Sequence, residues 1–183
     1  MMYEYSAKCN QLNPNVIPSN VDIFLDNIPN QHPHVARICP EQGYILIWHA
    51  DAKDYPTIAE NAFRCKNEPQ NVNCNDANRI EIGMAIVYPY EDEVILGTVK
   101  YFGYVYRLGR SKTTAITKQI WKDIILMFGD RKIICPSGSY LEWLHLSMNQ
   151  ERIPTLTYKR QILKPLGFMR QQNYWIRDAN ILA

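Results

Sequence analysis

Apolar and polar residues alternate through the middle of the chain with the period of two that marks a half-buried β-strand. The alternation covers residues 79–90, where the apolar positions are Ile80, Ile82, Met84 and Ile86. The acidic residues 91–93 separate this run from a second β-rich run at residues 94–106, and the two runs predict a hairpin. We expect Gly97 or Gly103 to introduce a bulge into the second, longer strand.

A helical spacing of apolar residues follows at residues 111–128. One stripe recurs every three or four positions, as the core-facing side of an amphipathic helix requires, and consists of Ile116, Ile120, Ile124 and Met127. Ser111 is a favourable N-cap and Gly129 a favourable helix stop, so both ends of the helix are predicted. Residues 131–135, which include two isoleucines, predict the next strand.

The last quarter of the chain continues this alternation of elements. Ser139 and Glu142 form a capping box that predicts one helix, and a second helix is expected over residues 155–163, before Pro165. A final strand fits residues 168–176. From the first hairpin onward, the order strand, strand, helix, strand, helices, strand predicts a mixed α/β or α+β sheet covered by helices.

The first half of the chain is rich in turn formers and poor in long regular elements. Twelve of the fifteen asparagines precede residue 80. Residues 43–48 are β-branched and aromatic and predict a buried strand, whereas residues 21–25 and 55–63 are expected to form short helices. Residues 66–78 consist almost entirely of turn formers and predict an exposed loop.

Composition indicates a single globular domain. The chain has 183 residues, of which 46% are hydrophobic, and this is enough to form a core without disulfides or metals. We therefore expect one domain over residues 1–183, in which the turn-rich residues 1–79 complete the fold of residues 80–183. Apolar runs of about four residues exclude a membrane-spanning helix, and a start without an export signal indicates the cytoplasm.

The cysteines do not form a metal or disulfide pattern. Their number is odd, no C-x-x-C pair occurs, and the four histidines lack zinc-ligand spacing, so we expect reduced thiols and no metal site. Cys135 is one candidate nucleophile, because a following helix N-terminus would lower the pKa of its thiol. A buried thiol at the end of a strand is the alternative.

Positive charge is concentrated in the second half of the chain. Residues 1–80 hold 6 basic and 9 acidic side chains, whereas residues 81–183 hold 14 basic and 9 acidic ones. We expect an anionic ligand to meet this second half. Nucleic acid is one such ligand, because aromatic and basic residues are interleaved at Tyr101, Phe102, Tyr104, Tyr106, Arg107 and Arg110. A core-facing aromatic stripe is the alternative interpretation.

The junction between the second predicted strand and the long helix has the features of a phosphate site. Gly109 permits close approach of a ligand, and the first N–H groups of the helix point outward together with the positive end of its dipole. The cationic side chains are Arg107, Arg110 and Lys112, and the hydroxyl side chains are Ser111, Thr113 and Thr114. The glycine and lysine pattern of a Walker loop is absent. An ordinary helix start with solvated charges is the alternative.

The order of elements over residues 80–180, with its Leu166-Gly167-Phe168 motif, resembles the GNAT acetyltransferase superfamily. In that family the backbone amides of a loop [QR]-x-x-G-x-[GA] bind the pyrophosphate of acetyl-CoA. Gly109 matches the first glycine of this loop, whereas Tyr106 and Ser111 depart from it. The resemblance implies a GNAT-like mixed sheet flanked by helices, an irregular N-terminal region, and an acetyl-CoA site at Arg107, Leu108, Gly109, Arg110, Ser111 and Lys112.

The resemblance also implies a reaction, in which an amine attacks the thioester of the cofactor. The family's general acid is a tyrosine just before the Leu-Gly-Phe motif, and Leu163 occupies that position here. The candidate general bases are Glu81, Glu91, Glu93 and His145. Glu81 lies on the strand before the cofactor strand, where the resemblance places a base in many members. Solvated surface positions are the alternative for the other three.

Three functions remain open from the sequence. The first is an acyl-CoA dependent N-acyltransferase. The second is a catalytically silent GNAT-like structural or assembly protein of a virus particle, with protein partners, similar to the small GNAT-like internal virion proteins of short-tailed phages. In that case the host cytoplasm or the virion is the expected location. The third is nucleic-acid binding through the basic half.

Overall fold

The fold is given by a computed structural model, which describes residues 17–26, 43–63, 78–136, 162–171 and 174–179. Its strands are β1 (Val21–Asp26), β2 (Gly43–Asp51), β3 (Arg79–Pro89), β4 (Glu93–Tyr101), β5 (Lys132–Pro136), β6 (Met169–Gln171) and β7 (Tyr174–Arg177). Its helices are the α-helices α2 (Pro56–Ala59) and α3 (Arg110–Phe128) and the 3₁₀ helices η2 (Ala52–Asp54), η3 (Gly103–Leu108) and η5 (Lys164–Leu166).

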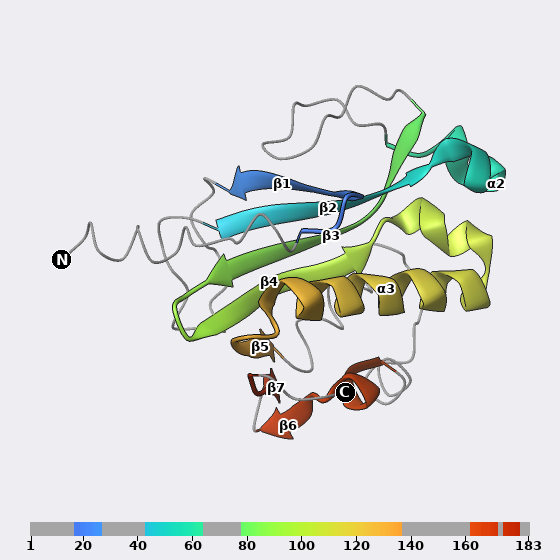
Figure 1. The fold of residues 1–183 in the computed structure, drawn as a ribbon. Helices are drawn as coiled ribbons and strands as arrows, with labels where there is room; N and C mark the ends of the chain where they lie inside the picture. Colours follow the sequence, from blue (N-terminus) through green and yellow to red (C-terminus); the bar gives the residue numbers. More distant parts are fainter. Residues whose placement is uncertain (1–16, 27–42, 64–77, 137–161, 172–173, 180–183) are drawn as a thin grey trace.

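The seven strands of the described residues form one mixed sheet in the order β1-β2-β3-β4-β5-β7-β6 (Figure 1). Neighbouring strands are antiparallel except β4 and β5, which are parallel. A parallel pair needs a crossover connection, and α3 supplies it on one face of the sheet. The expected mixed α/β fold class is confirmed, with a sheet that is mostly antiparallel.

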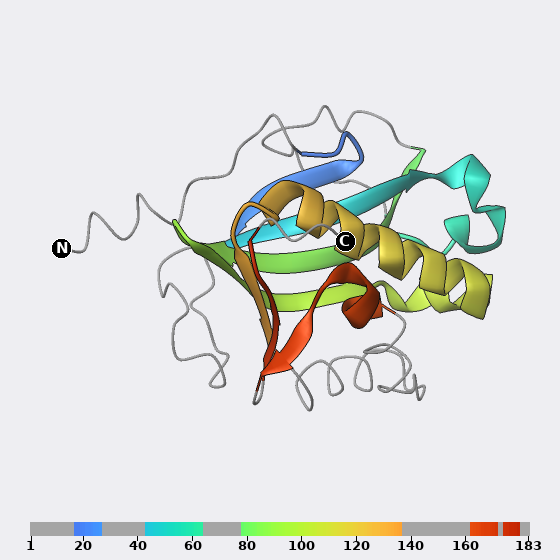
Figure 2. The same cartoon turned by 60° about the horizontal axis from the view of Figure 1, so that its bottom comes forward.

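The main core lies between α3 and the sheet. The apolar stripe that the spacing predicts on this helix is buried, at Ile116, Ile120, Ile124 and Met127. Gly83 of β3 allows this close packing, because a Cβ atom at that position would overlap the Cδ1 atom of Ile120. Trp121 of α3 also packs edge-to-face on Phe168, with ring centroids 5.4 Å apart. The segment around η5 therefore covers the same face of the sheet as α3 (Figure 2).

β4 has a bulge at one of the two glycines where the sequence predicts it. Leu96 and Thr98 pair with consecutive residues of β3, so Gly97 is the additional residue between them. A Cβ atom at Gly97 would lie 3.1 Å from the ring of Tyr88, which is tighter than ordinary van der Waals contact. A glycine at position 97 therefore permits the bulge and leaves room for the Tyr88 ring.

The prediction that this strand continues to residue 106 is wrong beyond Tyr101. The backbone N–H of Phe102 donates to the carbonyl of Ile82 at 3.1 Å, and the N–H of Val105 then donates back to the Phe102 carbonyl at 2.9 Å. Val105 is fully buried in the core. Burial of this side chain stabilises the turn of η3 in place of a longer strand.

Residues 21–25 form a strand, so the prediction of a short helix there is wrong. β1 pairs with β2 in antiparallel register, with Val21 opposite Trp48 and Asp26 opposite Gly43. Val21 and Ile23 are buried in the main core with the period of a strand. Short segments follow their tertiary partners more than their intrinsic propensity, and the partner strand here lies farther along the chain.

Three further predictions are corrected at the ends of elements. The helix expected over residues 55–63 is limited to the single turn of α2. The strand expected over residues 168–176 is an antiparallel pair, β6 and β7. Helix α3 begins at Arg110 with Gly109 as its N-cap, so Ser111 lies inside the first turn and is not the cap. A glycine N-cap leaves the first N–H groups of the helix without a side-chain acceptor.

Several predictions fall outside the described residues. They concern the loop over residues 66–77, the helix at Ser139, the greater part of the helix over residues 155–163, and Cys9, Cys39, Cys65 and Cys74. Within the described residues, no helix combines the length and the apolar character needed to cross a bilayer.

Candidate functional site

The turn before α3 is open and glycine-dependent. Gly109 has φ of 89° and ψ of 163°, and a Cβ atom built there would meet nothing within 4 Å. The first intrahelical hydrogen bond runs from the N–H of Thr113 to the carbonyl of Gly109, at 3.1 Å. The N–H groups of Arg110, Ser111 and Lys112 precede that bond and have no side-chain cap. They form the kind of donor set that anions occupy at helix N-termini.

Three basic residues lie in or next to this turn. Arg107 at the end of η3 and Arg110 and Lys112 in the first turn of α3 are all exposed. The positive end of the helix dipole adds to their charge. The loop therefore has the donors and the electrostatic potential to bind a phosphate group.

The hydroxyl and apolar members of the loop have different roles. The Thr113 hydroxyl donates to the Gly109 carbonyl at 2.8 Å and is buried, so the expectation that it serves a ligand is wrong. Ser111 is exposed, so its contact with a ligand stays a prediction. Leu108 is half-buried and packs against the main core, so it offers a ligand only its backbone.

The candidate bases that the structure describes lie in two different places. Glu81 is half-buried on β3, and its backbone carbonyl accepts a hydrogen bond from the Tyr104 hydroxyl of η3. Glu91 and Glu93 lie at the β3–β4 hairpin, at the opposite end of the nine-residue strand β4 from η3. That strand spans roughly 26 Å, so neither residue serves as a base for chemistry at the start of α3. His145 lies outside the described residues.

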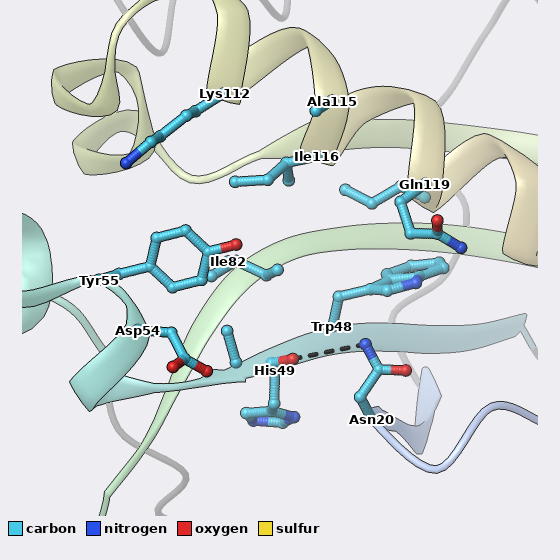
Figure 3. A pocket seen from close by; sticks show the side chains of 12 residues that line it. Asn20, Trp48, His49, Asp54, Tyr55, Ile82, Lys112, Ala115, Ile116 and Gln119 are labelled. Atoms are coloured by element: carbon cyan, nitrogen blue, oxygen red, sulfur yellow. Dashed lines mark hydrogen bonds between the residues drawn. The ribbon is translucent and has the colours of Figure 1, made fainter.

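A pocket of about 500 Å³ adjoins the same helix start (Figure 3). It runs between α3 on one side and the end of β2 with η2 on the other. Its lining consists of Asn20, Trp48, His49, Ala50, Asp54, Tyr55, Ile82, Lys112, Ala115, Ile116, Gln119 and Ile120. Lys112 belongs to both the loop and the pocket, whereas Arg110 is not part of the pocket lining.

A polar cluster around the buried Asp123 lies at one end of the pocket. The Trp48 indole N–H donates to Asp123 Oδ2 at 2.9 Å, and the Gln119 side-chain amide donates to Asp123 Oδ1 at 2.8 Å. Both carboxylate oxygens of the buried Asp123 are thus satisfied. The cluster ties β2 to α3 across the sheet face and holds the Trp48 ring as the pocket floor.

A second buried polar group lies at the start of the sheet. His49 Nδ1 is 3.0 Å from Asp22 Oδ2, and the two side chains are 1% and 0% exposed. Burial, and secondarily the charge of Arg79, lowers the pKa of His49 to about 4, while burial raises the pKa of Asp22. Neither imidazole nitrogen has hydrogen-bond geometry to another described residue. The imidazole is therefore neutral near pH 7.

Burial corrects one other expectation and bears on a second. Cys135 is fully buried, and burial raises the pKa of its thiol well above the ordinary value, so it is not an activated nucleophile. In the aromatic and basic interleaving, Tyr101 is in the core and Tyr104 is hydrogen-bonded to the backbone of β3. Phe102 stacks on Tyr104, with centroids 5.9 Å apart, which leaves Tyr106 as the most exposed ring of the four. Of the four rings only Tyr101 is buried, so nucleic-acid binding through the other residues of this segment stays a prediction.

Comparison with protein-family models, with curated proteins and with solved structures gives no match. A functional proposal for this chain therefore rests on the site itself. The loop at residues 107–112 can be located in the sequence, because a glycine and basic residues before a strong helix are a local signal. The pocket is missed by sequence reasoning, because its walls come from segments about sixty residues apart. Only its helix side, with Lys112, Ile116 and Gln119 on one face, forms a local pattern.

Proposed function

We propose that the chain is a GNAT-like domain that binds acyl-CoA, with the pyrophosphate held at Arg107–Lys112. The observation that carries this proposal is the Gly109 turn, where three uncapped N–H groups and three exposed cations lie at one helix start. Pyrophosphate has the charge and the acceptor oxygens that such a set of donors requires.

The position of the loop in the fold supports the proposal. The connection β4–η3–α3–β5 links two parallel strands, and α3 begins beyond the carboxyl end of β4. Ligands of open α/β sheets bind outside the carboxyl ends of strands. The described pairing of β5 with β4 also covers only Glu93–Ile95, whereas β4 continues to Tyr101. The two strands are thus paired away from the loop and not beside it.

Catalysis is a separate part of the proposal. In an active enzyme, Glu81 is the base that we assign to the acceptor amine, because it lies on the strand next to η3. Leu163 is fully buried in the core, so the position of the family's acid is filled by a packing residue. This burial favours the second candidate, a catalytically silent GNAT-like domain that binds protein partners.

Calorimetric titration with acetyl-CoA tests the binding proposal. We expect micromolar affinity, which corresponds to about −8 kcal/mol. The variant Arg110→Ala/Lys112→Ala should lose at least about tenfold in affinity, because two charge-assisted contacts are removed. The variant Lys118→Ala/Lys122→Ala removes two exposed lysines farther along the same helix and should bind as the natural sequence does. No heat at millimolar acetyl-CoA from the folded protein would refute the proposal.

Release of free CoA thiol in the presence of a panel of primary amines separates the active from the silent form. An active enzyme should lose about 10²-fold or more of its rate on Glu81→Gln while it keeps acetyl-CoA affinity. Binding without thiol release from any amine supports the silent domain.

A further inference from the structure

The pocket beside α3 has a distinct charged end and a distinct apolar middle. Along the helix it extends from Lys112 to Gln119, a distance of about 10 Å at helical rise. Along the opposite wall it extends from Asp54 and Tyr55 to Trp48. Trp48 and the exposed Gln119, which share Asp123 as hydrogen-bond partner, mark one end, and Asp54 and Lys112 mark the other.

The charged end offers two opposite charges to a ligand. In Figure 3 Lys112 and Asp54 come from opposite walls at the end where the Tyr55 ring lies. Neither side chain forms an ion pair or a hydrogen bond with another residue of the described ranges. Both are exposed, so each can exchange its water for a ligand group at small desolvation cost.

The middle of the pocket suits an apolar group. Its floor and wall combine the Trp48 ring with the buried Ile82, Ile116 and Ile120. The Tyr55 hydroxyl points toward this middle in Figure 3. A volume of about 500 Å³ lies within the roughly 300–1,000 Å³ range of small-molecule sites, and an apolar lining with a few polar groups is their usual composition.

We propose that this pocket binds a free α-amino acid with a large apolar side chain. The α-ammonium group pairs with Asp54, the α-carboxylate pairs with Lys112, and the side chain lies over Trp48 and Ile116. A zwitterion carries both charges on one carbon atom, and the pocket presents both counter-charges at one end. A purely cationic or purely anionic ligand would leave one of the two charged residues unused. The site goes beyond acyl-CoA binding, although it shares Lys112 with the proposed pyrophosphate loop, so each ligand is tested in the absence of the other.

Calorimetric titrations without acetyl-CoA test this site with three probes, L-phenylalanine, phenethylamine and 3-phenylpropionate. Phenylalanine should bind at least about tenfold more tightly than either probe that lacks one charged group. Asp54→Asn should reduce phenylalanine affinity to that of 3-phenylpropionate. Asp92→Asn removes an exposed carboxylate at the far hairpin and should change nothing.

The outcomes separate this proposal from acyl-CoA binding. Arg110→Ala should weaken acetyl-CoA binding and leave phenylalanine affinity unchanged. Asp54→Asn should weaken phenylalanine binding and leave acetyl-CoA affinity unchanged. As a control, circular dichroism and thermal melting of each variant test whether it is folded. Equal affinity for phenylalanine and phenethylamine would overturn the proposal, because the carboxylate would then be unrecognised. Absence of phenylalanine binding at millimolar concentration would overturn the proposal as well, regardless of whether the protein binds acetyl-CoA.

Discussion

At the scale of single residues, Gly109 sets the geometry of the candidate site. Its backbone angles, φ of 89° and ψ of 163°, lie in a region that is essentially restricted to glycine. They let η3 end and α3 begin at once, with the first N–H groups of α3 directed outward. Gly109 can be singled out from the sequence because a glycine before a strong helix is a local signal. Its role as N-cap cannot, since residue preferences favour Ser111 for that position.

Replacement of Gly109 by alanine tests this geometry. Gly109→Ala should lower the free energy of unfolding by about 1–3 kcal/mol, because the side chain is strained at these angles although there is space for it. Because the N–H groups of Arg110, Ser111 and Lys112 would be reoriented by the substitution, acetyl-CoA binding should also weaken. Urea denaturation and calorimetry measure the two effects.

Gly167→Ala is the matched control for this change. Gly167 has the same φ of 89° with ψ of 10°, so alanine should cost about 1–2 kcal/mol there. It lies after η5 and outside the loop, so acetyl-CoA affinity should stay unchanged. Full affinity in Gly109→Ala would show that the turn is not needed for binding.

The buried His49 predicts a pH-dependent stability. Its pKa is lowered to about 4 by burial and by Arg79, from an ordinary value of 6.5. Between these two values the unfolded chain binds a proton that the folded chain does not bind. The free energy of unfolding should therefore rise with pH across this window, by up to about 3 kcal/mol from this group. Asp22, whose pKa is raised, acts in the opposite direction and offsets part of the rise.

Urea denaturation of the natural sequence and of His49→Gln between about pH 4.5 and pH 7 measures this contribution. The natural sequence should gain more stability with rising pH than the variant does. Parallel pH profiles for the two proteins would contradict a neutral, buried imidazole.

At the scale of elements, periodicity predicts what is local and fails where the determining contact is distant. The stripe of α3 is sufficient, because it buries one continuous face. The alternation of β3 predicts a strand but not the whole of its buried face, because Ile80 and Ile82 are in the main core whereas Met84 and Ile86 are half-buried. Ala85 and Val87 occupy the core positions in the second part of this strand. The prediction of a helix for β1 is wrong, since nothing within residues 21–25 reveals that β2 pairs with it. The predicted end of β4 is too late, because η3 depends on burial of Val105, which no local pattern shows.

The packing of α3 on β3 predicts a coupled pair of substitutions. Gly83→Ala should destabilise the protein by about 1–3 kcal/mol, because its Cβ atom would overlap Ile120 and lie 3.0 Å from the Lys100 carbonyl. Ile120→Val removes the overlapping methyl group, so it should recover part of the loss. A double-mutant cycle by urea denaturation measures this coupling, and simple additivity of the two changes would contradict the packing described here.

At the scale of the whole molecule, the fold class is predictable from the sequence and the sites are only partly so. The alternation of strands and helices in the second half predicts a mixed sheet covered by helices, and the sheet has that form. The loop at residues 107–112 is contiguous in the chain and can be recognised there. The pocket cannot, because Asp54 and Lys112 line the same pocket only after β2 and α3 have packed on each other.

The most direct test of the central proposal is a backbone-amide NMR titration with acetyl-CoA. We predict that the largest chemical-shift changes fall on the N–H groups of Arg110, Ser111 and Lys112, because they are the uncapped donors of α3. Amides at the β3–β4 hairpin, at the other end of β4, should not shift. Saturable shifts that leave these three N–H groups unchanged, or no shifts at millimolar ligand, would contradict acyl-CoA binding at this loop.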